Sequence, residues 1–354
     1  MTTVSITGLH RRFSPQFGIE GLDLELGEGE FVTLLGPSGS GKTTTLRILA
    51  GLEKPDSGKV VVGGRVMNDA GVFVPPHRRR MGMVFQSYAV WPHRTVYENV
   101  AFPLKVQGVS RDEERKRVAE MLDLVELQSG TFAERYANQL SGGQQQRVSL
   151  ARALVARPDV VLYDEPLSNL DARLRDVMRT LIRDIHNRIK TTSLYVTHDQ
   201  SEAMVLSDRV CIMDRGRIVR QDTPRGLHAR PDSRFVTEFL GGANILRVET
   251  HDKASGELRL ASGAVMRATQ WPEGTPEHFV IRHHHVALLP QGMQAENVLD
   301  VVVRSSEFLG DRVRLTLESE GGLVLVASMV PPQVEIMPGA ALRVVLPVEH
   351  CLVI

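Results

Sequence analysis

The chain has 354 residues, which is enough for two or three domains and a sizeable core. Lysine plus arginine and aspartate plus glutamate both number 42, so the formal net charge is zero, and this balance argues against a dedicated nucleic-acid binder. Two cysteines, Cys211 and Cys351, exclude a disulfide framework and fit a reduced, cytoplasmic setting, and no apolar run approaches the length of a membrane span.

Short strands are expected at the start of the chain. Residues 4–9 form the first, and a basic, turn-like stretch over 10–13, which ends in Phe13, follows it. Three leucines alternate with polar residues over 22–26 and predict a strand with one buried face. The apolar run 31–35 predicts a buried strand directly before a glycine-rich loop.

This loop fits the phosphate-loop pattern G-x-x-x-x-G-K-[ST], and a helical pattern over 43–52 follows it. Strand, glycine loop and helix start are the context that the motif requires, because backbone N–H groups and the helix N-terminus then point at phosphate oxygens. Lys42 is placed to reach the β- and γ-phosphates, and the Thr43 hydroxyl is placed to ligate Mg²⁺. The residues expected to bind nucleotide are Gly36, Pro37, Ser38, Gly39, Ser40, Gly41, Lys42, Thr43 and Thr44.

The character of the chain becomes helical after a strand over 81–85 that ends at Gln86. The helical stretch covers about 87–156. Within it, Ser141 and Gln144 stand three residues apart and predict a capping box at the start of a helix.

A continuous apolar run over 160–163 predicts a strand that is covered on both faces and ends at Asp164-Glu165. The elements expected after it are a helix over 172–189, a strand over 193–196 that stops at Thr197-His198, and a hairpin of 210–213 with 218–219.

The pattern of apolar residues changes in the last third of the chain. Residues 221–242 are expected to form a linker that contains a short helix near 235–240. Beyond Ala243, short apolar alternations broken by glycine and proline predict a small all-β domain, a barrel.

Three consecutive histidines, His283, His284 and His285, raise the question of a metal site in this β-rich region. On a strand, alternate side chains point to opposite faces, so at most two of the three share a side. A polar strand end is therefore preferred over a metal site.

Five motifs occur in a characteristic order within residues 4–240. They are the phosphate loop, Gln86, the run Leu140-Ser141-Gly142-Gly143-Gln144, the pair Asp164-Glu165, and His198. This set resembles the motifs of the ATP-binding-cassette (ABC) ATPases. The resemblance implies an α/β fold, with a P-loop ABC ATPase domain over 1–240 and a helical subdomain over about 87–156.

The closer resemblance is to importer ATPases that end in a β-rich regulatory domain, such as those of maltose, spermidine/putrescine and ferric-iron uptake. The runs 83–93, 235–241 and 282–289 carry this likeness. The last of them begins Arg282-His283-His284-His285, where the family often has arginine-proline-glutamate. The resemblance implies an OB-like (TOBE) all-β barrel domain over 241–354.

The resemblance also implies roles in the chemistry. Asp164 would hold Mg²⁺ through water, with Thr43 and Gln86 as the other metal-binding residues. Glu165 would be the general base that acts on the attacking water, and His198 would contact the γ-phosphate. Gln86 would also join Mg²⁺ and the attacking water to a membrane partner.

Further roles concern ATP binding. Phe13 would stack on adenine, because an aromatic face suits any base. Ser141, Gly142, Gly143 and Gln144 would bind the ATP held by an opposite subunit, since a second capped helix start offers N–H donors to a γ-phosphate. A homodimer with two shared ATP sites is therefore expected.

The resemblance as a whole implies the ATP-hydrolysing subunit of an ABC importer, which uses ATP and Mg²⁺. Its expected partners are a second copy, integral membrane permease subunits and, indirectly, an external solute-binding protein, with no nucleic acid. A groove at residues 88–93 would receive a short helix of the permease, although a local apolar cluster is the alternative. The protein would lie peripherally on the cytoplasmic face of the inner (plasma) membrane, and ferric iron or polyamine is favoured as its transported substrate.

Three alternatives remain open. The first is a non-transport ABC ATPase that acts on nucleic acid or ribosomes, against which the neutral charge and the β-rich C-terminal region argue. The second is a soluble phosphate-loop kinase, in which the run 140–144 would have no role. In the third, the C-terminal domain is mainly a regulatory binding module and the ATPase activity is secondary.

Overall fold

The structure is a computed structural model, and it describes residues 2–14, 17–272, 274–290, 292–332 and 335–354. The chain divides into two compact units, Met1–Leu227 and His228–Ile354. The limits 1–240 and 241–354 expected for the two domains stay a prediction. In the described ranges no helix has both the length and the apolar character needed to cross a membrane.

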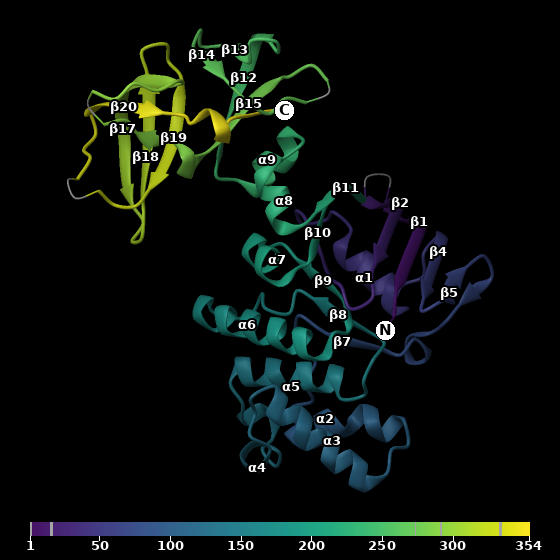
Figure 1. Cartoon of the computed structure of the whole chain (residues 1–354). Helices are drawn as coiled ribbons and strands as arrows, with labels where there is room; N and C mark the ends of the chain where they lie inside the picture. Colours follow the sequence, from purple (N-terminus) through teal and green to yellow (C-terminus); the bar gives the residue numbers. More distant parts are fainter. Residues whose placement is uncertain (1, 15–16, 273, 291, 333–334) are drawn as a thin grey trace. The chain divides into compact units, whose positions relative to one another are not determined.

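A six-stranded sheet forms the centre of the first unit (Figure 1), in the order β11-β10-β3-β9-β8-β7. All neighbours are parallel except the hairpin of β10 with β11. The strands are β3 (Phe31–Leu35), β7 (Met81–Val84), β8 (Val160–Asp164), β9 (Thr192–Thr197), β10 (Arg209–Asp214) and β11 (Arg217–Asp222). Strands β3, β8 and β9 are buried along their whole length, as their apolar runs predict. Because they are parallel, the residues that follow them meet at one edge of the sheet.

An antiparallel sheet in the order β2-β1-β4-β5-β6 completes the β-structure of this unit. Its strands are β1 (Val4–Ser14), β2 (Phe17–Leu26), β4 (Ser57–Val62), β5 (Arg65–Asp69) and β6 (Val72–Phe73). The prediction of a turn over 10–13 is wrong. These residues continue β1, because bulges let the strand bend while Arg11 and Arg12 still pair with β2.

Figure 1 shows the helices α2 to α5 gathered beside α6 in the first unit. The helices of this unit are α1 (Lys42–Ala50), α2 (Val96–Val106), α3 (Arg111–Leu124), α4 (Ser129–Phe132), α5 (Gly142–Leu154), α6 (Ala172–Ile189) and α7 (Gln200–Leu206), with 3₁₀ turns η1 (Pro76–Arg78) and η2 (Ala137–Gln139). The capping box of α5 is confirmed: Ser141 Oγ accepts from the Gln144 N–H, and Gln144 Oε1 accepts from the Ser141 N–H. The helix over 172–189 is confirmed as α6.

The second unit is built mainly of β-strands, as its short apolar alternations predict. Helix α8 (Pro224–Ala229) spans the boundary between the two units, and α9 (Arg234–Leu240) follows in the second unit. One sheet has the order β14-β13-β12-β15-β21 and the other β16-β20-β17-β18-β19. The strands are β12 (Ala243–Asp252), β13 (Glu257–Leu260), β14 (Val265–Arg267), β15 (His278–Arg282), β16 (Ala287–Leu288), β17 (Val298–Phe308), β18 (Val313–Ser319), β19 (Val324–Met329), β20 (Ala341–Val345) and β21 (Leu352–Val353).

Both sheets of the second unit contribute to one core, in which Phe279 of β15 and Leu315 of β18 are fully buried. The Asn244 side chain also joins the sheets. Its Nδ2 donates to the Val326 carbonyl oxygen at 2.9 Å, and its Oδ1 accepts from the Val326 N–H at 2.7 Å. The amide thereby satisfies backbone groups of the edge strand β19.

The three histidines are not a strand end, so that prediction is wrong. They form the 3₁₀ turn η3 (His283–His285) directly after β15. Strand pairing stops at Arg282, whose buried guanidinium turns inward to donate to the carbonyl oxygens of Gly241 and His228. In the described part of the chain, no group of three or more His, Cys, Asp or Glu side chains is arranged to hold a metal ion.

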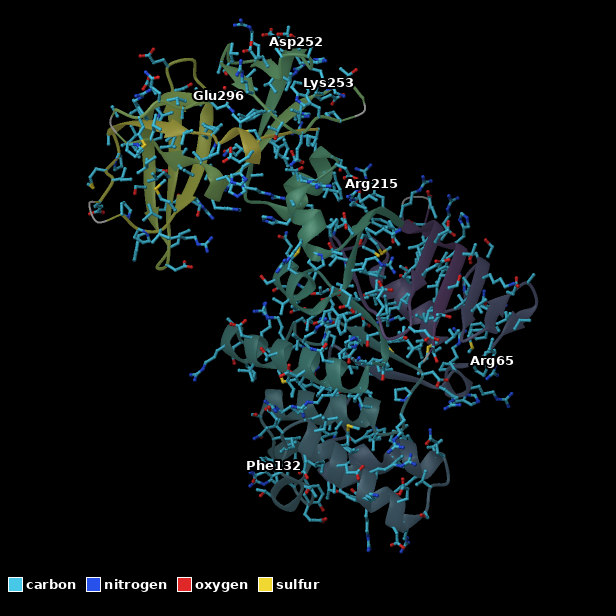
Figure 2. All side chains as sticks on the ribbon, in the orientation of Figure 1. Arg65, Phe132, Arg215, Asp252, Lys253 and Glu296 are labelled. Atoms are coloured by element: carbon cyan, nitrogen blue, oxygen red, sulfur yellow. The ribbon has the colours of Figure 1, made fainter. Side chains whose placement is uncertain are left out.

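Charged side chains cover the outside of each unit. Figure 2 shows Arg65 and Arg215 on the first unit and Asp252, Lys253 and Glu296 on the second, and all five are exposed. Both signs occur on these surfaces, in keeping with the zero formal net charge.

Candidate functional site

The phosphate loop joins β3 to α1 at the carboxyl edge of the central sheet. Gly36 has no room for a side chain, because an added Cβ would lie 2.2 Å from the Met213 carbonyl oxygen. Gly41 is the N-cap of α1 and has a φ of 101°, in the left-handed region that favours glycine. These two glycines let the loop pass close to β10 and turn into the helix.

Lys42 lies buried within this loop. Its Nζ donates to the carbonyl oxygens of Gly36 and Pro37, at 2.8 and 2.9 Å, and to Ser40 Oγ at 3.4 Å. Burial lowers the pKa of the ammonium group, and the Glu165 carboxylate opposes that shift. Since only neutral oxygens bond this ammonium group within the described residues, a phosphate would supply a charged partner for it.

Thr43 and Asp164 meet beside the loop. Asp164 is 6 % exposed, and Thr43 Oγ1 donates to its Oδ1 at 3.2 Å. Burial raises the pKa of Asp164, whereas the hydrogen bond from Thr43 and the charge of Arg47, which lies 3.9 Å away, lower it. A carboxylate and a hydroxyl are oxygen ligands of the kind that Mg²⁺ takes, and a divalent cation would offset the burial of the carboxylate. The pair therefore fits the expected Mg²⁺ site.

Gln86 is exposed after the end of β7. Its carbonyl oxygen accepts a hydrogen bond from Asn169 Nδ2 at 2.9 Å. Among the residues that the structure describes, the Gln86 side chain makes no hydrogen bond to Thr43 or Asp164. Its part in the Mg²⁺ site stays a prediction.

Glu165 and His198 face each other across neighbouring strands. Asp164 of β8 pairs with Val196 of β9, so the residues just beyond both strand ends are brought together. His198 Nδ1 lies 3.1 Å from Glu165 Oε2. Glu165 has a left-handed backbone with a φ of 44°, and its N–H donates to the Val196 carbonyl oxygen at 3.0 Å. An unfavourable backbone at this position indicates a constraint of the kind found at functional sites.

A cavity of about 340 Å³ lies at the phosphate loop. Phe13 and Phe17 form one end of its lining, and both rings are more than half exposed. The Arg11 guanidinium lies 4.9 Å from the Phe13 ring centroid. The lining residues are Phe13, Phe17, Gly18, Ser38, Gly39, Gly41, Lys42, Thr43, Thr44 and Glu165. The cavity thus joins an aromatic surface to a phosphate loop and a carboxylate, as a nucleotide site requires.

Known proteins share this fold and these motifs. Residues 19–168 match the sequence model of the family described as ABC transporter, and residues 276–354 match that of the TOBE domain. The chain is 50 % identical over 315 residues to the Fe(3+) ions import ATP-binding protein FbpC of Vibrio cholerae, a match that covers 89 % of this chain and 87 % of that protein. This chain belongs to the ABC transporter family.

Two further proteins to which this chain is similar are also ATP-binding parts of transporters. The chain is 42 % identical over 359 residues to the spermidine/putrescine import ATP-binding protein PotA of Rubrobacter xylanophilus, covering 99 % of this chain and 93 % of the relative. It is also similar to the dimeric structure of MJ0796, a bacterial ABC transporter cassette, with 34 % identity and a TM-score of 0.54 over 63 % of this chain and 99 % of that one. The expected fold class is confirmed, and the chain is the ATP-hydrolysing subunit of an ABC importer. A subunit of this kind binds ATP and works with permease subunits.

The run Ser141 to Gln144 of this ABC ATPase lies at the start of α5. Ser141 and Gly142 are exposed, and none of the four residues lines the phosphate-loop cavity. Gly143 is buried against Leu174 of α6, since an added Cβ would lie 2.6 Å from Leu174 Cδ2. The residues expected to bind ATP therefore lie on two separate surfaces of one chain.

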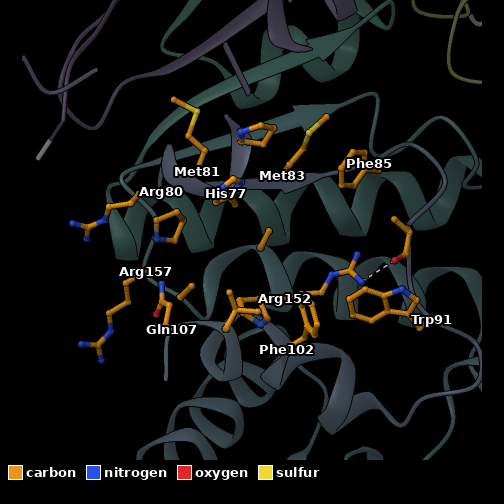
Figure 3. Close-up of a pocket in the computed structure, with 18 residues that line it drawn as sticks. His77, Arg80, Met81, Met83, Phe85, Trp91, Phe102, Gln107, Arg152 and Arg157 are labelled. Carbon is orange, nitrogen blue, oxygen red and sulfur yellow. Dashed lines mark hydrogen bonds between the residues drawn. The ribbon is translucent and has the colours of Figure 1, made fainter. Parts of the chain in front are cut away.

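A second cavity of the ABC domain, of about 540 Å³, lies between the central sheet and the helices α2 and α5 (Figure 3). Trp91 lines it and packs edge-on against Phe102, with ring centroids 4.8 Å apart. Arg152 places its guanidinium 4.9 Å from the Trp91 ring centroid and donates to the Ala89 carbonyl oxygen at 2.8 Å. The apolar residues that follow Gln86 thus border an open groove.

Some residues near the ABC site were not predicted from the sequence. Phe17 is one member of the cavity lining that no motif indicated. A buried, hydrogen-bonded set next to His198 is made up of Tyr195, Thr197 and Glu202, and the Nε of the partly exposed Arg175 lies 4.0 Å from Glu202 Oε1. The only signal in the sequence is that Tyr195 and Glu202 lie close to Thr197-His198, and no signal indicates Arg175.

Proposed function

We propose that this importer ATPase hydrolyses ATP to ADP and phosphate with Glu165 as the general base. The observation that carries the proposal is the 3.1 Å contact of His198 Nδ1 with Glu165 Oε2 beside the phosphate-loop cavity. The Glu165 carboxylate accepts the proton of the attacking water and orients that water toward the γ-phosphorus. His198 holds the carboxylate in place and contacts the γ-phosphate.

The phosphate loop and Mg²⁺ would compensate the negative charge of the triphosphate. The Lys42 ammonium group exchanges its neutral oxygen partners for the β- and γ-phosphates. Thr43 and Asp164 would hold Mg²⁺, which would supply positive charge to the phosphate oxygens. Phe13 offers its exposed ring to adenine, and Phe17 lines the same end of the cavity.

Two copies of the chain share two ATP sites in this proposal. The helix start at Ser141 lies outside the cavity of its own chain, yet it offers capped N–H donors of the kind that bind phosphate. A second copy that presents this helix start to the γ-phosphate would complete each site. The likeness to a dimeric ABC cassette supports this arrangement.

The groove at Trp91 is proposed to seat a short helix of the permease. It is lined mostly by apolar and aromatic residues, and its charged lining residues, Arg80, Arg152 and Arg157, are all cationic. Within the described chain no carboxylate lines the groove. A helix with one apolar face and an acidic residue would therefore complement it. This docking would hold the subunit peripherally at the cytoplasmic face of the membrane.

Ferric iron is the proposed cargo, and polyamine is the alternative. The support is the likeness to a ferric-iron import protein at 50 % identity and to a spermidine/putrescine import protein at 42 %. The cargo itself is recognised by the permease and by an external solute-binding protein.

The cargo is tested in vesicles that hold the complete importer with its binding protein. ATP hydrolysis is measured while ferric iron, polyamines, phosphonates, sulfate, thiamine and sugars are supplied in turn. Stimulation by ferric iron is expected. Stimulation by sugars alone would contradict the proposed cargo, and no stimulation by any solute combined with stimulation by RNA would contradict the importer role.

A further inference from the structure

A buried carboxylate lies next to the residues that carry His198. Glu202 of α7 is 2 % exposed. Its Oε2 accepts hydrogen bonds from Tyr195 Oη at 2.8 Å and from Thr197 Oγ1 at 2.7 Å. Burial raises the pKa of Glu202, and these two donors oppose the shift by stabilising the charged form.

The residues on both sides of His198 are tied to Glu202. Thr197, just before it, donates to the Glu202 carboxylate. Asp199, just after it, donates its N–H to Thr197 Oγ1 at 2.9 Å, and its Oδ1 caps α7 by accepting from the Glu202 N–H at 3.1 Å. The backbone of His198 is thus held between two anchored neighbours, although its own ring is more than half exposed.

Arg175 of α6 connects this assembly to a second loop. Its Nη1 donates to Asp199 Oδ2 at 3.1 Å, and its Nη2 donates to the Leu170 carbonyl oxygen at 3.2 Å. Its Nε lies 4.0 Å from Glu202 Oε1. One planar guanidinium therefore meets the loop after β9 and the loop 168–171 at the same time.

The loop 168–171 also contacts Glu165. Ser168 Oγ donates to the Glu165 carbonyl oxygen at 3.0 Å. A closed ring of contacts thus runs from Glu165 through this loop to Arg175, on to Asp199 and His198, and back to the Glu165 side chain.

We propose that Arg175 and Glu202 are positioning residues for ATP hydrolysis. They hold the His198 imidazole against the Glu165 carboxylate and lock this pair to the loop 168–171. The inference rests on the roles proposed above for Glu165 and His198. Neither residue lines the phosphate-loop cavity, so they act on turnover and leave ATP binding unchanged.

The chain offers a matched control for a purely structural role. Arg183 lies eight residues further along α6, just over two turns away. It also donates to one carbonyl oxygen and one carboxylate, those of Leu206 and Asp208, each at 2.8 Å. The exposed fractions of the two arginine side chains are nearly equal, 30 % for Arg175 and 29 % for Arg183. Only Arg175 is bonded to a neighbour of His198.

The first test compares Arg175→Gln with Arg183→Gln in steady-state ATP hydrolysis by the full chain. Arg175→Gln is expected to lower kcat by about 10- to 100-fold and to leave KM within about threefold, because displacing reacting groups by roughly 1 Å costs this much in rate. Arg183→Gln is expected to keep both constants near wild type. Equal losses in the two variants, or a raised KM with kcat kept in Arg175→Gln, would overturn the inference.

Glu202→Gln gives an independent second variant. The amide oxygen can still accept from both hydroxyls, but the amide carries no charge, so the ion pair with Arg175 is lost. We expect kcat to fall by about 10-fold with KM kept, within the range of coupling between residues in contact. A folded Glu202→Gln protein, judged by its thermal unfolding, that turns over like wild type would count against the inference.

A double-mutant cycle shows whether Arg175 acts through His198. Single-turnover rates are measured for Arg175→Gln, His198→Ala and the double variant. The penalty of Arg175→Gln is expected to vanish when His198 is already removed. If the rate losses of the two single variants multiply in the double variant, Arg175 does not act through His198, and the positioning role is contradicted. A His198→Ala protein that turns over like wild type would contradict the role of His198 and, with it, this inference.

Discussion

The charged residues of the ATP site are held in buried surroundings that oppose their charge. Burial lowers the pKa of Lys42 and raises the pKa of Asp164, so both shifts favour the neutral form. Each group keeps partial compensation from neutral donors or acceptors, such as Thr43 for Asp164. A triphosphate with its metal ion would add charges opposite to those of both groups, so we expect both groups to bind it.

For the single residue Lys42, we predict that Lys42→Ala abolishes hydrolysis and weakens ATP binding by about 10- to 100-fold. This is the size expected for one lost hydrogen bond between charged groups. Binding is measured by isothermal titration calorimetry and turnover by phosphate release. Lys59→Ala is the control, because Lys59 is exposed on β4 and pairs only with Asp69 among the described residues. Near-normal turnover of Lys42→Ala would refute the assignment of this loop.

The sequence motifs predict the residues that would touch ATP but not those that hold them. The phosphate loop is predicted by its own pattern, and Asp164, Glu165 and His198 by the resemblance of the motif set to that of the ABC ATPases. Glu202 and Arg175 belong to no such motif, because their partners are reached through folding: Arg175 bonds a residue 24 positions away and a carbonyl five positions away. Burial and geometry reveal what residue type and order do not.

At the scale of elements, local signals decide which predictions succeed. Helix α6 was predictable because Met178, Leu181, Ile182 and Ile185 form one buried face, and α5 because its cap is local. The continuation of β1 over 10–13 and the turn η3 were not, because bulges prolong β1 and the inward Arg282 side chain ends β15. Both causes lie in contacts between distant segments. Such contacts produce no periodic spacing of apolar residues in the sequence.

We expect the turn η3 to make the second unit sensitive to acid. The His285 ring lies 4.2 Å from the His284 ring and stacks on His350 with centroids 3.7 Å apart. Burial first, and then the charges of His284, His350, His228 and Arg282, lower the pKa of His285 to about 4. In the unfolded chain a histidine has a pKa of about 6.5.

The sign of the effect follows from this lowered pKa. The folded unit holds His285 neutral, so its contribution to stability is present above about pH 6.5 and is lost as the pH falls from about 6.5 toward 4. We predict that thermal unfolding of the second unit shifts to lower temperature across this window. His285→Phe should reduce the shift, whereas His251→Phe, outside this cluster, should keep it. A shift that is identical in wild type and His285→Phe would disprove the effect.

At the scale of the whole molecule, the ATP site belongs to the first unit alone. Every residue that lines the phosphate-loop cavity lies before Leu227. We therefore predict that a chain ending near Gly242 stays soluble and binds ATP within about threefold of the full chain, a difference below 1 kcal/mol of binding free energy. Fluorescent-nucleotide titration of both chains tests this. An insoluble or inactive product would count against a separately folding β-rich domain over 243–354.

The central claim is that Glu165 is the base of a site shared by two chains. Glu165→Gln keeps the size and reach of the side chain but cannot take the proton of water, so hydrolysis should fall by roughly 10²- to 10⁴-fold. ATP binding should survive, because Lys42 and the loop amides are unchanged. Each trapped ATP would then bridge the phosphate loop of one chain and the Ser141 helix start of the other. Glu126→Gln is the matched control, because the Glu126 side chain is exposed and pairs with Arg147.

The most direct measurement is size-exclusion chromatography of Glu165→Gln with and without ATP, combined with its hydrolysis rate. We predict that Glu165→Gln is a dimer only with ATP and shows almost no turnover, while Glu126→Gln hydrolyses ATP like wild type. Wild-type hydrolysis by Glu165→Gln would show that Glu165 is not the base. A variant that binds ATP, does not hydrolyse it and stays monomeric would contradict the shared site.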